Sequence, residues 1–348
     1  MNWKHQKETL LQIAPWCVDD IAIDASTIFI SGWAIPFMGV WSNLEFFVNN
    51  KIVETFIRSK RTDLKGVFPF WSEVEKSGFI IELENDAFPD SEDLVISRNK
   101  NFSQSSLDNY YFPVSEDWKL KLPTPLLRNQ VHGSESKTAF ILEGFSSYRK
   151  LDFLVQKYIG EGINDASPIL DWGCGCARVC RHIKDKQDNL IGVDINNEAI
   201  SWCKEHISGR FEVSTSLPPL SFSNNHFKVV YGVSILTHLS PEDQRLWINE
   251  LLRITQKGGV VILSFHGIRS LLRFNLKNDD FSELNEKNFV NLGRNSAFEP
   301  TDNLGERYYD TVQTSDFFES LLEVPCDMAF HQGVFGNHQD VLVLKKLE

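Results

Sequence analysis

The chain has few cysteines, and no stretch of it has the composition of a signal peptide or of a membrane span. Six cysteines in 348 residues are too sparse for a secreted disulfide scaffold, so we expect reduced thiols. The N-terminal residues contain no apolar run of signal-peptide length. Residues 25–44 carry no charge, but Pro36 and several glycines and serines interrupt them, which indicates strands and turns. We therefore expect a cytoplasmic protein with no integral membrane segment.

An excess of positive charge is also absent. The 35 lysines and arginines are outnumbered by 47 aspartates and glutamates, which gives a net charge of −12, and neither half of the chain is basic. Binding to nucleic acid or to an anionic membrane depends on clustered positive charge. The composition therefore favours a small-molecule or glycan partner and no nucleic acid.

Residues 19–100 have the pattern of a small all-β domain. Short apolar runs are separated by turn-forming residues about every 10–15 positions, and Asn49-Asn50 joins two of them as in a hairpin. This pattern predicts a β-sandwich accessory domain. We expect a helical lead-in at residues 1–18 and a linker at residues 101–122, where polar residues and prolines replace the apolar pattern.

From residue 123 to residue 348 the pattern changes to alternating strands and helices, which is typical of a parallel sheet. The predicted fold class is α/β, with a Rossmann-like open sheet that is mostly parallel and ends in a C-terminal antiparallel hairpin, preceded by the small all-β sandwich. The predicted helices are 139–158, 176–184, 197–206, 241–254 and 314–323, and the predicted strands are 168–171, 190–194, 211–213, 228–231, 260–265, 327–332 and 340–344.

A glycine-rich turn follows the first predicted strand of this region, in the sequence ILDWGCGCAR (169–178). Gly173 permits a tight turn, and Gly175 lets a ligand approach the backbone because it has no Cβ. The next strand ends in Asp194, whose carboxylate can accept hydrogen bonds from a ribose diol. Arg178 stands where a dinucleotide-binding turn has its third glycine, which argues against a pyrophosphate there. The sequence therefore predicts a crevice for a nucleoside.

Residues 123–348 resemble the class I S-adenosylmethionine-dependent methyltransferases. The resemblance depends on LDWGCGCARV (170–179), on Asp194, on the segments 217–239 and 251–267, and on the final strand QDVLVLKK (339–346). It implies S-adenosyl-L-methionine as the cofactor. It implies that the following residues form the cofactor site: Asp171, Gly173, Cys174 and Gly175 at the methionine and ribose end, Asp194 on the ribose hydroxyls, Ile195 beside the adenine, Ser216 and Leu217 at its border, and Gly232 and Val233 under the sulfonium.

The N-terminal region is similar to a β-sandwich module of bacterial sugar-modifying enzymes. The similarity is carried by GWA (32–34), RTDL (61–64) and SGF (77–79). It implies that the methyl acceptor is a hydroxyl of a sugar or of a glycan-linked molecule. Methylation of another small metabolite or lipid is the second hypothesis. The β-domain could bind glycan or pair two copies of the chain as a homodimer.

Transfer to a hydroxyl needs a base, and histidines are the natural candidates. His266 directly follows a predicted strand at its carboxyl end and ranks first, and His238 follows the strand at 228–231 and ranks second. Cys174, Cys176 and Cys180 with His182 have a spacing that could suggest zinc, but the glycines between them already have a cofactor role, so we expect no metal.

The connection from Gly267 to Val312 is too long for a compact domain unless it has a use. We expect an insertion at residues 267–312 with little regular structure, which closes over the acceptor. Its deletion should abolish transfer and leave cofactor binding intact. Two further hypotheses remain: a non-catalytic cofactor-binding or interaction protein, and a nicotinamide-dependent oxidoreductase.

Overall fold

The computed structural model describes residues 15–24, 26–35, 44–68, 73–84, 93–98, 106–114, 121–184, 189–274, 276–294 and 308–347. The chain forms two compact units. The first comprises Met1–Leu122 with Ser136–Ser146 and Leu271–Asn275, and the second comprises Pro123–Glu135, Ser147–Ser270 and Leu276–Glu348. No helix among these described residues is long and apolar enough to cross a membrane.

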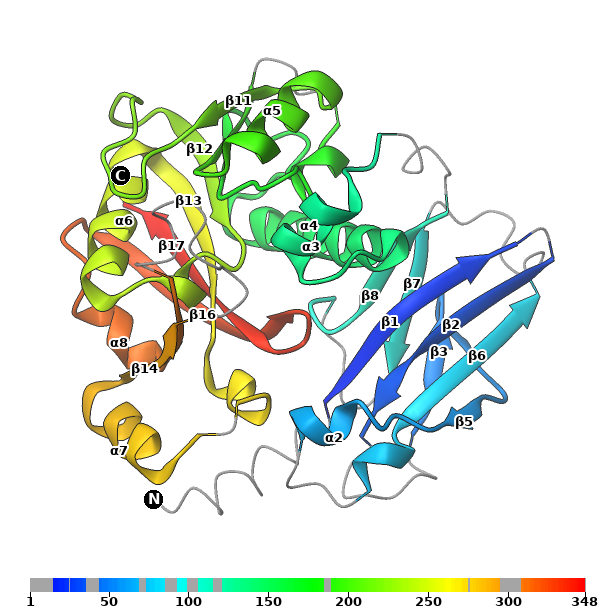
Figure 1. Cartoon of the computed structure of the whole chain (residues 1–348). Coiled ribbons are helices and arrows are strands. Elements are labelled where there is room, and N and C mark those ends of the chain that lie inside the picture. The colour runs from blue at the N-terminus through cyan, green and yellow to red at the C-terminus, as the bar shows by residue number, and fades with distance from the viewer. Residues whose placement is uncertain are drawn as a thin grey trace. The chain divides into compact units, whose positions relative to one another are not determined.

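The first unit contains two four-stranded antiparallel sheets (Figure 1). One has the order β1 (Trp16–Ile23), β2 (Thr27–Ala34), β6 (Gly78–Glu84) and β5 (Ile57–Ser59). The other has the order β4 (Lys51–Ile52), β3 (Phe46–Val48), β7 (Asp93–Arg98) and β8 (Tyr110–Pro113). Two short helical segments, α2 (Leu64–Val67) and η3 (Val74–Lys76), precede β6. The all-β prediction for this region is confirmed.

Aromatic side chains join the two sheets. The Phe46 ring of β3 lies 4.3 Å from the Phe79 ring of β6 and 6.2 Å from the Trp16 ring of β1. The predicted hairpin is present, because Asn49 and Asn50 adopt φ values of 47° and 64° and let β3 pair with β4. Asparagine tolerates this left-handed conformation better than most residues, and two such residues form the tight turn that suits a hairpin.

Two expectations for the first unit are wrong. Residues 16–18 begin strand β1 instead of ending a helix, residue 15 is not helical, and residues 1–14 of the predicted lead-in lie outside the described residues. Within the predicted linker, Tyr110–Pro113 forms strand β8 and pairs with β7. The Ser146 hydroxyl accepts the Tyr111 N–H at 2.8 Å and donates to the Tyr111 carbonyl at 2.9 Å, so this edge strand is held by a residue distant in the sequence.

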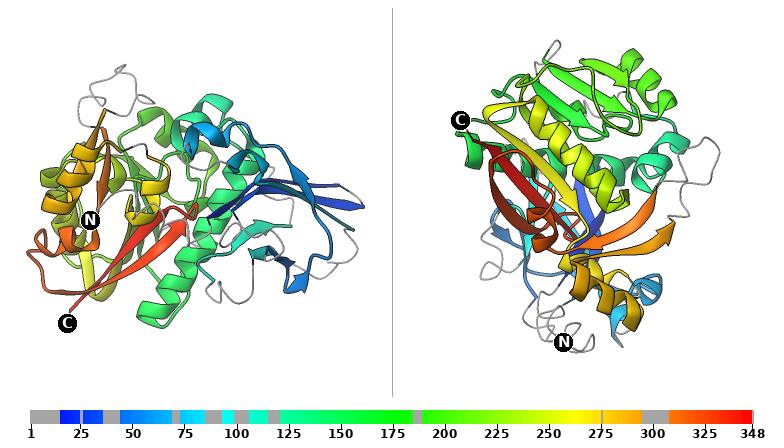
Figure 2. Two further views of the ribbon diagram at one scale, coloured as in Figure 1. Left: turned by 90° about the horizontal axis from the view of Figure 1, so that it is seen from below. Right: turned by 90° about the vertical axis from the view of Figure 1, so that its left-hand side faces the viewer.

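The second unit is built on a seven-stranded mixed sheet (Figures 1 and 2). Its order is β11 (Arg210–Val213), β10 (Leu190–Asp194), β9 (Ile169–Trp172), β12 (Phe227–Gly232), β13 (Thr255–Phe265), β17 (Gln339–Lys346) and β16 (Cys326–Phe335). Strands β9 to β13 run parallel, whereas β17 is antiparallel to β13 and to β16. The mixed α/β sheet that ends in an antiparallel pair is as predicted.

Helices α3 (Pro125–His132) and α4 (Lys137–Ile159) precede the sheet, and α5 (Asn197–His206), α6 (Pro241–Ile254) and α8 (Ser315–Glu319) are interleaved with its strands. The bounds of α5 and α6 match the prediction. The Asn196 and Ser240 side chains cap their first N–H groups. Helices α6 and α8 pack on one face of the sheet, where the Trp247, Leu251 and Phe318 side chains are buried.

The helix predicted at 176–184 is not present. The described residues form turns that lead into a short 3₁₀ segment, η6 (Cys180–His182). Ala177 has a φ of 59°, in the left-handed region, so the backbone leaves the right-handed helical path directly after the glycine turn. Helix α8 is also shorter than the predicted 314–323.

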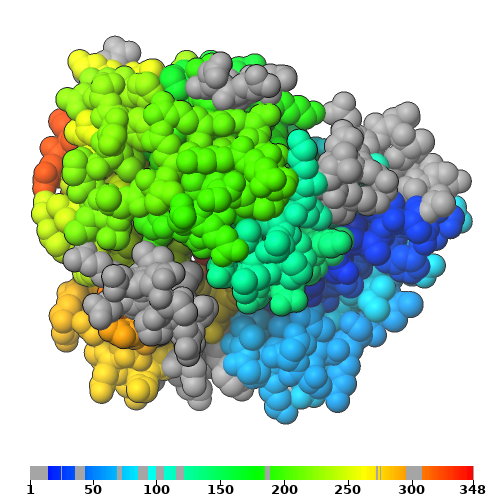
Figure 3. Space-filling view, turned by 45° about the horizontal axis from the view of Figure 1, so that its top comes forward, coloured from blue at the N-terminus to red at the C-terminus, as the bar shows by residue number. Residues whose placement is uncertain are grey.

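The insertion has more regular structure than expected. It contains η8 (Ile268–Leu272), α7 (Asn278–Lys287), and an antiparallel pair formed by β14 (Phe289–Arg294) and β15 (Tyr309–Gln313). The mostly exposed α7 is coloured gold in Figure 3. Another 3₁₀ segment, η7 (Leu236–His238), follows β12 and contacts β15.

Candidate functional site

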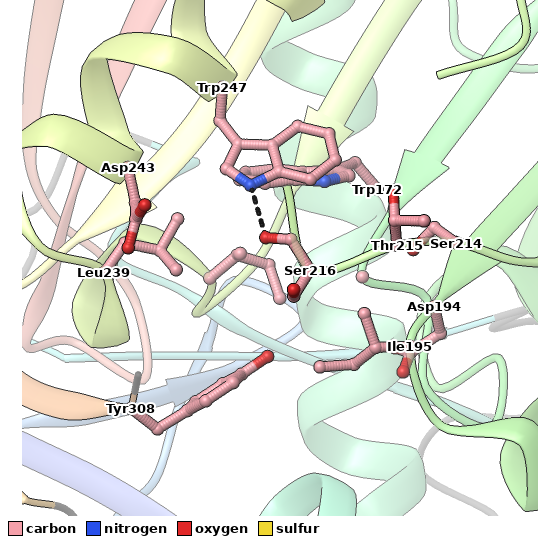
Figure 4. A pocket seen from close by; sticks show the side chains of 12 residues that line it. Trp172, Asp194, Ile195, Ser214, Thr215, Ser216, Leu239, Asp243, Trp247 and Tyr308 are labelled. Atoms are coloured by element: carbon pink, nitrogen blue, oxygen red, sulfur yellow. Dashed lines mark hydrogen bonds between the residues drawn. The ribbon is translucent and has the colours of Figure 1, made fainter. Parts of the chain in front are cut away.

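A pocket lies where the strand order of the mixed sheet reverses. From β9 the chain proceeds to β10 and β11 on one side, whereas β12 and β13 lie on the other side. In open α/β sheets, ligands bind outside the carboxyl ends of the strands at such a switch point. The residues that line the pocket are Trp172, Gly173, Asp194, Ile195, Ser214, Thr215, Ser216, Ile235, Leu239, Asp243, Trp247 and Tyr308 (Figure 4).

Asp194 connects the first two turns of the site. Its Oδ2 accepts the Gly175 N–H at 2.8 Å, and its Oδ1 accepts the Asn196 N–H at 2.8 Å. Burial raises the pKa of Asp194, and the backbone hydrogen bonds oppose that rise. Because each carboxylate oxygen can accept more than one hydrogen bond, both remain able to bind hydroxyl groups of a ligand. The Asp194 carboxylate lines the pocket.

The glycine turn has the expected backbone conformation. Gly173 and Gly175 have φ values of 75° and 52°. However, a Cβ on Gly173 would lie 2.1 Å from Ile235 Cδ1, and a Cβ on Gly175 would lie 2.8 Å from Val131 Cγ1. The surface of the turn is therefore covered by two aliphatic side chains in this structure. Gly173 reaches the pocket, and Gly175 contributes its N–H to Asp194.

Asp171 and Cys174 lie beneath the turn and do not line the pocket. Asp171 is 3% exposed, and burial raises its pKa to about 7, although the Tyr231 hydroxyl and the Cys180 thiol favour its charged form. Burial raises the pKa of the Cys174 thiol well above its ordinary value, and this thiol faces the Gly175 carbonyl oxygen at 3.6 Å. Both residues therefore support the turn from below.

The predicted adenine border is only partly in the pocket. Ile195 and Ser216 line it, whereas Leu217 does not and instead accepts the Thr215 hydroxyl at its carbonyl oxygen. The Trp247 indole N–H donates to the Ser216 carbonyl at 3.2 Å and so ties α6 to this border. Gly232 and Val233 do not line the pocket, and the Trp172 ring covers Gly232, with 2.7 Å from a hypothetical Cβ to ring carbon Cε3.

His238, the second-ranked base candidate, lies directly beside the pocket. Its sequence neighbours Ile235 and Leu239 line the pocket, and its ring centre is 5.9 Å from that of the lining residue Tyr308. The His238 Nδ1 atom is 2.9 Å from the Tyr309 carbonyl oxygen and 3.8 Å from Asp310 Oδ1. Burial lowers the pKa of His238, so the ring is neutral at neutral pH.

His266, the first-ranked candidate, does not line the pocket. Its side chain is buried (8% exposed), and its Nδ1 atom is 3.1 Å from the carbonyl oxygen of Thr311 in β15. Its ring centre lies 6.1 Å from that of His338. Polar side chains are thus packed at the carboxyl end of β13. Position after a strand alone did not identify which histidine lies beside the pocket.

The cysteines near the turn are not arranged as a metal site. In the described ranges, no cluster of three or more histidine, cysteine, aspartate or glutamate side chains could hold a metal ion. Burial raises the pKa of Cys176 to about 12 and the pKa of Cys180 well above its usual range, so both are protonated thiols. They act as small buried side chains under the turn.

The charges of the pocket discriminate between ligands. Two carboxylates, Asp194 and Asp243, line it, and no lysine, arginine or histidine is among its lining residues, all of which the structure describes. A pyrophosphate would bring two more negative charges into this site with no cation to meet them. The pocket instead suits a neutral or cationic ligand with hydrogen-bond donors.

Sequence reasoning assigned no place in the site to six of the lining residues. Trp172 belongs to the glycine motif, which gives it no role of its own, and Ile235 and Leu239 follow β12 in the segment 217–239 that carries part of the resemblance. Asp243 and Trp247 lie four positions apart on one face of α6, which is a signal that the sequence does contain. Tyr308 comes from the insertion, which was expected to cover the acceptor and not the cofactor.

Comparison with known proteins identifies part of this unit. Residues 169–259, from β9 into β13, match the family model of a methyltransferase domain. Among solved structures, the chain is similar to an S-adenosylmethionine-dependent methyltransferase from Methanosarcina mazei, with 21% identity over 56% of this chain and 97% of that one and a TM-score of 0.40. It is also similar to one from Clostridium acetobutylicum, with 16% identity over 58% of this chain and 92% of that one and a TM-score of 0.40. A third is magnesium protoporphyrin IX methyltransferase from Synechocystis with bound S-adenosylhomocysteine, with 13% identity over 63% of this chain and 93% of that one and a TM-score of 0.38.

Proposed function

We propose that this protein, which is an S-adenosylmethionine-dependent methyltransferase, transfers the methyl group to a hydroxyl oxygen of a sugar or of a glycan-linked acceptor. The enzyme class and the cofactor follow from the methyltransferase domain at residues 169–259. The observation that carries the proposal of a hydroxyl acceptor is a neutral histidine, His238, beside the pocket with one ring nitrogen already fixed by a backbone carbonyl.

The lining residues fit S-adenosylmethionine. The cofactor, when bound, supplies a methyl group on a sulfonium that is already a good leaving group. Asp194 would accept the two ribose hydroxyls, and Ile195 and Ser216 would border the adenine. The two carboxylates of the pocket suit the positive charge of the sulfonium. Ile235, whose side chain lies over Gly173, would turn to another rotamer to admit the methionine end.

His238 is the proposed general base. A carbonyl oxygen only accepts hydrogen bonds, so the contact with Tyr309 fixes the proton on Nδ1 and leaves the lone pair on Nε2. Nε2 can then take the proton of an acceptor hydroxyl as its oxygen attacks the methyl carbon. Asp310, 3.8 Å from Nδ1, would stabilise the imidazolium that results. Base assistance of this kind contributes roughly 10²–10⁴-fold.

The sugar class of the acceptor is supported by the N-terminal unit. Its GWA, RTDL and SGF segments are those that resemble the module of bacterial sugar-modifying enzymes. Arg61 of RTDL forms ion pairs with Asp19 and Asp63, and Gly78 of SGF leaves no room for a Cβ next to Ser59, so both segments have a structural role within the unit. These structural roles support a module of the same kind as in the sugar-modifying enzymes. The sugar class of the acceptor is proposed from that resemblance.

Methyl transfer from labelled S-adenosylmethionine to a panel of sugars, glycans, phenols and lipids tests the proposal. We expect label on a sugar or glycan hydroxyl, and a loss of about 10²-fold or more in His238→Asn with cofactor affinity unchanged. Label on a metabolite or lipid without sugar would overturn the acceptor class. Full activity of His238→Asn would overturn the assignment of the base.

A further inference from the structure

Strand β15 of the insertion is fixed to the loop that follows β12. The Thr311 hydroxyl donates to the carbonyl oxygens of Leu236 and Thr237, at 3.2 and 3.1 Å. The Gln313 amide donates to the Gln244 Oε1 atom at 3.2 Å, and Thr311, Gln313 and Gln244 are fully buried. Buried hydrogen bonds of this kind are costly to break because the groups would lose their partners. This strand is therefore a fixed wall of the site.

Tyr308 immediately precedes this strand and belongs to the same pocket as Asp194. Its ring enters the pocket, and its hydroxyl points toward Ile195 (Figure 4). Tyr308 and Asp194 line the same pocket, burial raises the pKa of Tyr308, and the negative charge of Asp194 raises it further. At neutral pH the phenol is thus a protonated group that can donate one hydrogen bond and accept another.

We propose that Tyr308 is a cofactor-binding residue that the insertion supplies, and that its hydroxyl binds the ribose of the cofactor next to Asp194. The Asp194 carboxylate can accept from the two ribose hydroxyls, but it has no proton to donate, so the acceptor sites of the ribose oxygens need another partner. A phenol on the opposite wall provides the missing partner, and its ring shields the ribose from water. The proposal depends on the cofactor and not on the identity of the methyl acceptor.

This inference changes what the insertion is expected to do. A segment that only closed over the acceptor could be removed without an effect on the cofactor. Because Tyr308 lies in the cofactor pocket and β15 positions it, removal of the insertion should weaken cofactor binding as well as transfer. The insertion would then contribute both to the cofactor pocket and to the place where the methyl acceptor binds. The Tyr309 carbonyl of the insertion fixes His238 through a hydrogen bond.

Calorimetric titration of the full-length protein with S-adenosylhomocysteine tests the role of Tyr308. Tyr308→Phe removes only the hydroxyl and should weaken binding about five- to tenfold, in line with one lost hydrogen bond. Tyr308→Ala removes the ring as well and should weaken binding further. Tyr158→Phe is the matched control, since it removes a phenol hydroxyl that is bonded to His331 Nε2 at 2.8 Å, outside the pocket. It should bind like the wild type.

An analogue of S-adenosylhomocysteine that lacks both ribose hydroxyls locates the lost bond. The wild type and Tyr308→Phe should bind this analogue equally, because the partner of the phenol is missing. Wild-type affinity of Tyr308→Phe for S-adenosylhomocysteine would overturn the proposal, and so would an equal loss toward both ligands. Neither outcome bears on the acceptor, which the transfer assay decides separately, and matching thermal unfolding of the variants excludes a folding defect.

Discussion

The Asp194 carboxylate binds the backbone of the glycine turn, with 2.8 Å between its Oδ2 and the Gly175 nitrogen. This contact joins the end of β10 to the turn after β9, the two elements that would hold opposite sides of the ribose. Asp194 thus positions the turn, and in the proposed site it would also bind the ligand. A substitution of Asp194 should therefore change both the stability of the protein and its affinity for the cofactor.

Asp194→Asn separates these two functions in part. An amide retains one oxygen, but its NH₂ group cannot accept the Gly175 or Asn196 N–H, so one buried donor loses its partner. We expect a loss of about 1–3 kcal/mol in the free energy of unfolding and at least a tenfold loss of affinity for S-adenosylhomocysteine. Chemical denaturation and calorimetry measure these effects. Asp279→Asn, on exposed α7, should change neither, and unaltered affinity in Asp194→Asn would exclude it from the ligand site.

Asp171 gives the site a pH-dependent stability. Its pKa rises from 3.8 to about 7 in the folded protein because the carboxyl is buried. The folded state therefore binds more protons than the unfolded state between these values, and the contribution of Asp171 to stability falls as the pH rises from about 4 to 7. Asp171→Asn should remove this slope, so that its free energy of unfolding changes less with pH than that of the wild type. Parallel curves for the two proteins would mean that the Asp171 carboxyl is charged throughout.

His238 sets the expected pH profile of the reaction. Because burial lowers its pKa below 6.5, the neutral base is already formed at pH 7, and kcat/KM should rise with pH only below about 6.5 and then stay level. In His238→Asn, the amide NH₂ can still donate to the Tyr309 carbonyl, but no basic nitrogen remains. Its activity should be low, and this acidic limb should be absent. A limb that persists in the variant would assign the base to another group.

Sequence patterns identified the elements whose ends are set locally. Helices α5 and α6 begin at Asn196 and at Ser240-Pro241, which carry their own capping groups, so their bounds were predictable. Strand β8 was not predicted, because it depends on Ser146, a partner remote in sequence. The left-handed Ala177 also has no local signal, and without it the segment after the turn has a helical pattern.

In the candidate site, too, some residues could be predicted from local sequence and others could not. Asp194 and Gly173 were predictable because the motif places them at the carboxyl ends of adjacent strands. The choice between His238 and His266 depends on which loop β15 covers, and Tyr308 reaches the pocket only because β15 is bonded to the loop after β12. These relationships are tertiary, and no spacing in the sequence encodes them.

Lys346 holds the C-terminal end of α6 against the last strand. Its Nζ donates to the carbonyl oxygens of Leu252 and Thr255, at 2.8 and 2.9 Å, and to Asn225 Oδ1 at 2.8 Å. A cation at a helix C-terminus also complements the helix dipole. Lys346→Met should cost about 1–3 kcal/mol of unfolding free energy. Lys345→Met removes the same charge without these bonds, and an equal loss in that variant would show that net charge, not the cap, is responsible.

Ile235 covers Gly173, at the part of the pocket proposed for the methionine end of the cofactor. A Cβ on Gly173 would meet Ile235 Cδ1 at 2.1 Å, and Gly173 has a φ of 75°, which other residues adopt at a cost of about 1–2 kcal/mol. Gly173→Ala should therefore destabilise the protein by that strain plus the clash. Adding Ile235→Ala removes the clash but not the strain, so the double variant should recover part of the stability, as urea denaturation would measure.

Ile235→Ala alone tests the same contact from the ligand side. In the proposed site the cofactor would take the space over Gly173 that Ile235 occupies, so the wild type would have to move this side chain and the shortened variant would not. We expect Ile235→Ala to bind S-adenosylhomocysteine as tightly as the wild type or more tightly, despite a loss of packing of about 2–5 kcal/mol in stability if the site does not relax. Weaker binding by this variant would mean that Ile235 packs on the ligand itself. The side chain would then be a part of the bound site, and the space over Gly173 would not be the path of the methionine end.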